Sequence, residues 1–257
     1  MNPLQSIGQY SFSLMRAVGA LVLFANKAVM PIISPPWYGK QIIRQMIDIG
    51  FYSLPVIGMT AIFTGAVLAL QSYSGFSRFS AESSIPTVVV LSITRELGPV
   101  LAGLMVAGRI GAACAAEIGT MRVTEQIDAL ITLSTNPFKY LVFPRLIAGI
   151  ITLPFLVLIA DIIGVMGGYL VSVYKLGFSA GPYINNTLQF LEFHDVISGL
   201  VKASVFGFII TLMGCYHGYY SKGGAQGVGS ATTHAVVSAS ILILLSNYIL
   251  TEIFFSL

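Results

Sequence analysis

The sequence predicts an all-α integral membrane protein, in which an N-terminal interfacial helix precedes five transmembrane helices. Composition is the first observation behind this prediction. Of 257 residues, 56% are hydrophobic and only 9% are charged, whereas a water-soluble domain carries charges on roughly a quarter of its residues. The second observation is the spacing of these charges. It leaves apolar stretches that can cross about 30 Å of hydrocarbon as helices of about 20 residues.

Residues 1–45 predict a helix that lies on the membrane surface. Apolar residues recur there at helical spacing, at Ile7, Leu14, Val18, Leu21, Val22 and Val29. Arg16 and Lys27 leave only ten residues between them, which is too few to span the bilayer. Pro31, Pro35 and Pro36 then interrupt the helix. We therefore assign residues 1–45 to an interfacial region and residues 46–257 to the transmembrane domain.

Five stretches are apolar on most faces and predict the spanning helices. They run from Asp48 to Arg78, from about Ser84 to Glu117, from Arg145 to about Tyr174, from about Val196 to Tyr219, and from about Ala231 to Leu250. With the N-terminus in the cytoplasm, nine Lys and Arg residues fall inside, and only Arg78 and Lys175 fall outside. Because cytoplasmic loops carry excess positive charge, we expect a multi-pass protein with a cytoplasmic N-terminus.

The connection between the second and third spans predicts a short amphipathic helix on the cytoplasmic side. Gly119 and Asn136-Pro137 bound this helix. Its apolar face consists of Val123, Ile127, Leu130 and Ile131. Its polar face includes Arg122, Glu125 and Asp128. Such a helix either connects two spans along the membrane surface or docks a cytoplasmic partner, and the pattern alone does not decide between these roles.

Two adjacent charges, Arg95 and Glu96, lie inside the second span. Counted from Ser84, Arg95 lies ~16 Å down the helix, near mid-membrane. Neighbours on a helix point about 100° apart, and the cost of a charge in lipid places both against protein or water. They either form interhelical salt bridges that fix a dimer or form a polar patch in a cavity wall, which we favour. Pro99 removes a helical hydrogen bond to the Arg95 carbonyl, which predicts a kink.

The end of the first span supplies further candidates for a cavity wall. They are Leu68, Gln71, Tyr73, Phe76 and Phe79. Large apolar groups with a few polar ones suit an amphiphilic ligand such as a lipid, although the same residues also suit an aromatic belt at the interface. Small residues recur every four positions at Gly108, Ala112 and Ala116, and again at Gly164 and Gly168. This spacing predicts close helix packing.

Asp161 in the third span and Lys202 in the fourth are predicted to form a buried ion pair. Asp161 lies ~24 Å and Lys202 ~21 Å from the cytoplasmic side, so their depths nearly coincide. We expect the pair to be structural, with a proton relay as the alternative.

One apparent catalytic motif is set aside. The stretch "GFSAG", with Ser179 at its centre, fits the nucleophile elbow of serine hydrolases, but that motif requires a strand–turn–helix in an α/β sheet. The cysteines and histidines have no metal-ligand spacing. We expect no metal, no cofactor and no nucleic-acid partner.

Four ordered motifs resemble one known family. They are "RELGPVLAGLMVAGRIGAACAAEIGTMRVTEQIDAL", "PFKYLVFPR", "ADIIGVMGG" and "GVGSATTHAVVSAS". Together they resemble the MlaE-type permeases, the membrane subunits of the bacterial Mla lipid-transport ABC system and of the related chloroplast lipid importer. The resemblance covers roughly Ile42 to Leu250.

This resemblance implies a homodimeric permease in the bacterial inner membrane that supports outer-membrane lipid asymmetry. It implies a separate cytoplasmic ATPase, a periplasmic MCE-domain carrier that exchanges phospholipid with a central cavity, and a small cytoplasmic accessory subunit. The residues that would couple to the ATPase are Glu117, Arg122, Glu125 and Asp128. The resemblance also places Arg95 and Glu96 beside the lipid site.

The residues themselves also favour a separate ATPase, because the chain contains no G-x-x-x-x-G-K-[ST] phosphate loop. We therefore expect it not to be an enzyme. The alternatives are an ion-coupled secondary transporter using Asp161, Glu96 and Lys202, and an intramembrane hydrolase built on Ser179. The absence of an internal inverted repeat argues against the former.

Overall fold

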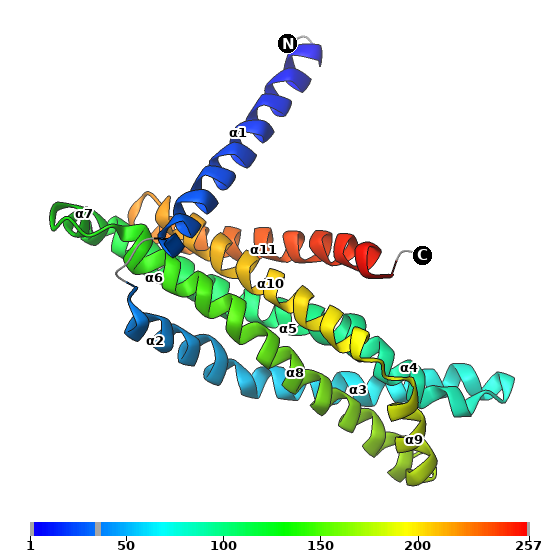
Figure 1. The fold of residues 1–257 in the computed structure, drawn as a ribbon. Coiled ribbons are helices and arrows are strands. Elements are labelled where there is room, and N and C mark those ends of the chain that lie inside the picture. Colours follow the sequence, from blue (N-terminus) through cyan, green and yellow to red (C-terminus); the bar gives the residue numbers. More distant parts are fainter. Residues whose placement is uncertain (1–2, 34–36, 256–257) are drawn as a thin grey trace.

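The computed structural model describes residues 3–33 and 37–255, which form helices joined by short connections. Five segments are long and apolar enough to cross a membrane: Gly39–Phe79, Glu82–Val123, Phe138–Tyr174, Phe193–Tyr219 and Gly224–Phe255. No β-strand occurs in the described ranges. The predicted all-α membrane fold with five spans is therefore confirmed (Figure 1).

The α-helices follow one another along the whole chain. They are α1 (Pro3–Val29), α2 (Gly39–Gly50), α3 (Leu54–Phe76), α4 (Ile85–Ser92), α5 (Gly98–Val106), α6 (Ala112–Val123), α7 (Gln126–Thr132), α8 (Phe143–Tyr174), α9 (Ala180–Phe190), α10 (Phe193–Tyr219) and α11 (Gly224–Phe255). Short 3-10 turns are η1 (Met30–Ile33), η2 (Phe51–Ser53), η3 (Ser77–Phe79) and η4 (Glu82–Ser84). Three π-helical turns are η5 (Ile93–Leu97), η6 (Ala107–Gly111) and η7 (Phe138–Val142).

The spanning segments are longer than the sequence predicted. The first combines α2, η2 and α3, so the division proposed at residue 45 falls inside α2. The second combines α4, α5 and α6 through two π turns and continues past Glu117 to Val123. The helices α7 and α9 lie at opposite ends of the bundle (Figure 1).

The predicted N-terminal helix is present as α1, which leaves the bundle at an angle (Figure 1). Its C-terminal part is held by Phe24, which is 1% exposed. The ring of Phe24 lies 5.1 Å from Phe138 and 5.4 Å from Tyr216 between centroids. Val18 and Val22, on the face of α1 that points away from the bundle, are more than half exposed.

The helix α8 is central and packs against α2, α3 and α10. Glycines allow its closest crossing, because a methyl group on Gly65 of α3 would overlap the Gly164 carbonyl of α8. Gly168 lies against Val89 and the Gly65 carbonyl, so the packing role predicted for Gly164 and Gly168 is confirmed. Gly108 is exposed, and no atom of another helix of the described chain comes within 4 Å of its Cβ position, so the packing role of Gly108 stays a prediction.

Candidate functional site: an intramembrane charge network

The second span places Arg95 and Glu96 on the π turn η5, where they contact two other helices. Arg95 Nε donates to Asp195 Oδ1 at 2.7 Å. The guanidinium carbon also lies 4.7 Å from the centroid of the Phe255 ring on α11, a cation–π distance. The Arg95 side chain keeps 35% of its surface exposed. Arg95 is therefore oriented by α10 and α11 but not enclosed by them.

Asp195 has two roles at the start of α10. Its Oδ2 accepts a hydrogen bond from the Glu192 backbone N–H at 3.1 Å, which is half of a reciprocal capping box. Its Oδ1 binds Arg95. Because Asp195 is 1% exposed, removing Arg95 alone leaves a buried carboxylate without its cation.

Glu96 is held by groups from α10 and α11. Its Oε1 accepts from Lys202 Nζ at 2.7 Å and from Thr251 Oγ1 at 2.8 Å. Its Oε2 accepts from Asn247 Nδ2 at 2.8 Å. These three donors compensate the carboxylate for its loss of water inside the membrane span.

Lys202 is fully buried, and its ammonium group has three hydrogen-bond acceptors. They are Glu96 Oε1 at 2.7 Å, Thr251 Oγ1 at 2.8 Å and the Arg95 carbonyl at 2.9 Å. Pro99 has no N–H to donate to that carbonyl, which is why the sequence predicts a kink there. The structure has a π-helical turn at this point, and Lys202 supplies the donor that Pro99 lacks.

The predicted ion pair between Asp161 and Lys202 is wrong. Lys202 pairs with Glu96, whereas the Asp161 Oδ1 atom is buried without a hydrogen-bond partner. Similar depth along two helices does not bring two side chains together, because each also points in one direction around its helix axis, and Lys202 points toward η5 and α11.

Four members of this network were missed at the sequence level: Asp195, Asn247, Thr251 and Phe255. Asn247 and Thr251 carry a usable signal, because they are polar, lie four residues apart in an apolar span and so share a helix face. Asp195 also carries a signal in the sequence, because it stands three residues after Glu192, which is the spacing of a capping box.

The candidates from the first span separate into two groups. Leu68, Tyr73 and Phe76 pack against the buried cluster that includes Ile85 and Val89. Gln71 and Phe79 are exposed. Their role in a ligand cavity stays a prediction.

The connection between the second and third spans contains the short helix α7, as predicted. The helix end expected at Gly119 is wrong, because α6 continues to Val123, so Arg122 and Val123 belong to α6 and not to α7. Glu125 adopts a left-handed conformation (φ 61°) immediately before it, and Ile127 is buried on its apolar face. Arg122 Nη1 donates to Asp128 Oδ1 at 2.7 Å at the surface. Glu117 instead accepts from Arg145 Nη2 at 2.6 Å, at the start of α8.

Ser179 precedes α9 and is exposed. In the part of the chain that the structure describes, no hydrogen bond joins Ser179 to a histidine, and His194 instead contacts Phe254 and Phe255. The arrangement offers no base for a serine nucleophile.

Comparison with known proteins identifies the chain. The family model described as "Permease MlaE" matches residues 42–253. The chain belongs to the MlaE permease family. A "Probable ABC transporter permease protein" of Rickettsia bellii is 67% identical over 255 residues, covering 99% of this chain and 98% of that protein.

More distant MlaE-related proteins also align over most of the chain. The Haemophilus influenzae protein named "Intermembrane phospholipid transport system permease protein MlaE" is 35% identical and covers 99% of this chain and 98% of its own length. The Arabidopsis thaliana protein "TRIGALACTOSYLDIACYLGLYCEROL 1, chloroplastic" is 36% identical, over 91% of this chain and 67% of its own length.

Proposed function

We propose that this MlaE-family chain is the permease subunit of an ABC-type complex that moves phospholipid between the bacterial inner membrane and a periplasmic MCE-domain carrier, in support of outer-membrane lipid asymmetry. In this proposal the permease is a homodimer with a cytoplasmic N-terminus. A separate ATPase subunit powers it, and a small cytoplasmic accessory subunit joins the complex.

One observation carries the lipid assignment. Arg95 uses Nε for Asp195, and within the described residues neither terminal nitrogen of its guanidinium makes a hydrogen bond. These two nitrogens form a planar fork that binds two oxygens of a phosphate at once. The Asp195 and Phe255 contacts hold the fork in place, so a lipid phosphate would bind without reorganising it.

The alternative of an ion-coupled transporter requires Asp161, Glu96 and Lys202 to act together. Asp161 forms neither a hydrogen bond nor an ion pair with the other two in the described chain. The phosphate-binding interpretation does not require Asp161 to meet Glu96 or Lys202.

The test compares lipid bound per dimer, measured by native mass spectrometry, among variants of Arg95. Arg95→Lys keeps the charge but loses the fork, and lipid affinity should fall about tenfold or more. Arg95→Met with Asp195→Asn removes both charges, so that no buried carboxylate is left unpaired and the protein stays folded. Arg78→Ala, at an exposed arginine of the turn η3, is the control.

The double variant should bind no lipid phosphate and show no transport, with a melting temperature near that of the wild type. If it retains wild-type lipid occupancy, Arg95 does not read the phosphate. If occupancy per folded dimer is normal but the melting temperature collapses, Arg95 acts only as a structural brace.

The ATPase contact is tested at the exposed face of α7. Reversing the charge of Glu125 and Asp128 together should weaken ATPase attachment or uncouple hydrolysis from transport, while dimerisation is preserved because both side chains are exposed. Glu82→Lys reverses an exposed carboxylate at the opposite end of the bundle and should have no effect. Normal assembly and transport in the doubly reversed protein would show that α7 is only a connector.

A further inference from the structure

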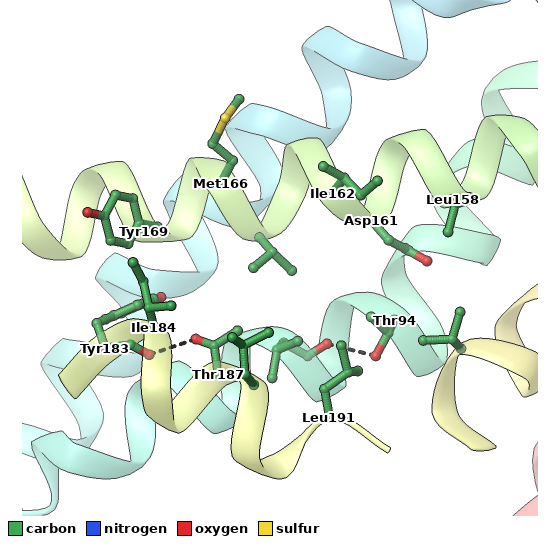
Figure 2. A pocket seen from close by; sticks show the side chains of 14 residues that line it. Thr94, Leu158, Asp161, Ile162, Met166, Tyr169, Tyr183, Ile184, Thr187 and Leu191 are labelled. Carbon is green, nitrogen blue, oxygen red and sulfur yellow. Dashed lines mark hydrogen bonds between the residues drawn. The ribbon is translucent and has the colours of Figure 1, made fainter. Parts of the chain in front are cut away.

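A cavity lies beside the π turn η5, between α4, α8, α9 and the start of α10. Its volume is about 400 Å³, within the range of about 300–1,000 Å³ typical of small-molecule sites. Figure 2 shows Ile162 and Met166 of α8 on one wall, with Ile184 of α9 opposite them. Nearly all of its lining is apolar.

The cavity opens sideways, between α8 and α9. Ile162 and Leu188, at its mouth, are 62% and 66% exposed. Because α8 belongs to the spanning segment Phe138–Tyr174 and these exposed side chains are apolar, we infer that in a membrane this opening faces hydrocarbon. A molecule with an alkyl chain would enter from the bilayer without crossing water.

Asp161 is the one charged residue in the lining. It is 6% exposed, and its Oδ1 lies without a hydrogen-bond partner against the backbone of Gly98. The two threonines of the lining already use their hydroxyl hydrogens, since Thr94 donates to the Val90 carbonyl and Thr187 to the Tyr183 carbonyl. The Tyr183 hydroxyl in the lining is also buried without a partner, so it could meet an acceptor oxygen on a ligand. Asp161 is the charged group that lacks a partner, and because its Oδ1 faces Gly98, a ligand would reach it at Oδ2, for which no hydrogen bond is found in the described residues. The unmet need at Asp161 is for a hydrogen-bond donor.

We propose that this cavity binds an amphiphile with an alkyl chain and a terminal hydrogen-bond donor, a hydroxyl or an ammonium group, which donates to the Asp161 carboxyl. A carboxylate accepts hydrogen bonds and repels a phosphate, so this site selects the opposite chemistry to Arg95. The burial of a carboxyl without a partner is costly, and a donor on the ligand removes that cost. The inference is independent of the proposed lipid-transport function.

The experiment uses the full-length permease in phosphatidylcholine nanodiscs and three photoreactive probes. All three carry the same diazirine-labelled dodecyl chain, and they end in a hydroxyl, an ammonium or a methyl ether. Crosslinked peptides are identified by mass spectrometry. The variants are Asp161→Leu, the isosteric Asp161→Asn, and, as a control away from the cavity, Leu244→Trp at an exposed position of α11.

In the wild type, the alcohol and the amine should label α8 and α9 about tenfold more than the ether. Asp161→Leu should remove this preference, and Leu244→Trp should keep it. Asp161→Asn retains an acceptor oxygen, so it should keep the alcohol and lose the amine if the carboxylate charge selects the ammonium. This variant also tests the proposal if Asp161→Leu does not fold. Equal labelling by all three probes in wild type would show that hydrocarbon fills the cavity adventitiously, and absence of labelling at α8 and α9 would also overturn the proposal.

Discussion

Replacing Lys202 with methionine tests whether the ion pair with Glu96 holds the second, fourth and fifth spans together. Methionine has a similar length and no charge, so the change removes the ammonium group with little change of volume. Three contacts are lost: the ion pair to Glu96 and the hydrogen bonds to Thr251 and the Arg95 carbonyl. The π turn then has an unpaired carbonyl inside the membrane.

The expected cost follows from the burial of the two partners. Removal of one member of a buried ion pair costs about 3–5 kcal/mol. Lys202 is fully buried, but the Glu96 side chain is 36% exposed and keeps Asn247 and Thr251 as donors. The cost should therefore lie at the lower end, about 3 kcal/mol. Adding Glu96→Gln should recover part of this loss, because the remaining carboxylate charge is removed as well.

The assay is a pair of double-mutant cycles on the purified protein, with free energies of unfolding measured by denaturant titration in mixed micelles. The Lys202–Glu96 cycle should give a coupling energy of about 2 kcal/mol, and a cycle of Lys202 with Asp161 should be additive within about 0.5 kcal/mol. Lys222→Met, at an exposed lysine, is the control and should cost almost nothing. Coupling to Asp161 with none to Glu96 would refute the pairing described above.

Three further changes test other parts of the fold. Gly65→Ala should lower the free energy of unfolding by about 1–3 kcal/mol, because its methyl group would overlap the α8 backbone. Gly58→Ala on the same helix, where the nearest atom is 3.5 Å away, should leave the thermal melt almost unchanged. Phe24→Ala should release α1 by removing about 3 kcal/mol of aromatic packing, and limited proteolysis should then cleave residues 30–38 faster. Leu23→Ala, at an exposed neighbouring residue, is the control. Equal cleavage of the two variants would contradict the anchoring role of Phe24. Burial raises the pKa of the Tyr183 hydroxyl above its ordinary value of 10.0, so stability should fall as the pH rises above 10, and a pH titration of the melt should show a smaller fall in Tyr183→Phe than in the wild type.

Local patterns in the sequence were sufficient to predict the spans, the amphipathic helix α7 and the irregular turn before Pro99. Each depends on residues close together in the chain: a run of apolar side chains, an alternation of faces over two turns, or one missing N–H group. The same holds for Gly164 and Gly168, whose spacing places both on one helix face. These properties depend only on which residues are near one another in the chain, so the sequence by itself determines them.

Only the tertiary structure decided which charged groups meet. Asp161 and Lys202 have similar depths along their helices, yet Lys202 turns to Glu96 and the Arg95 carbonyl. Asp195, Asn247 and Phe255 reach the same turn from distant parts of the chain. A sequence fixes how far along a helix a side chain lies, but its partner depends on how neighbouring helices rotate and cross. Between α10 and η5, for example, Gly199 lies so close to the Thr94 carbonyl that a methyl group would overlap it, and such small residues allow the close crossing that brings these groups together.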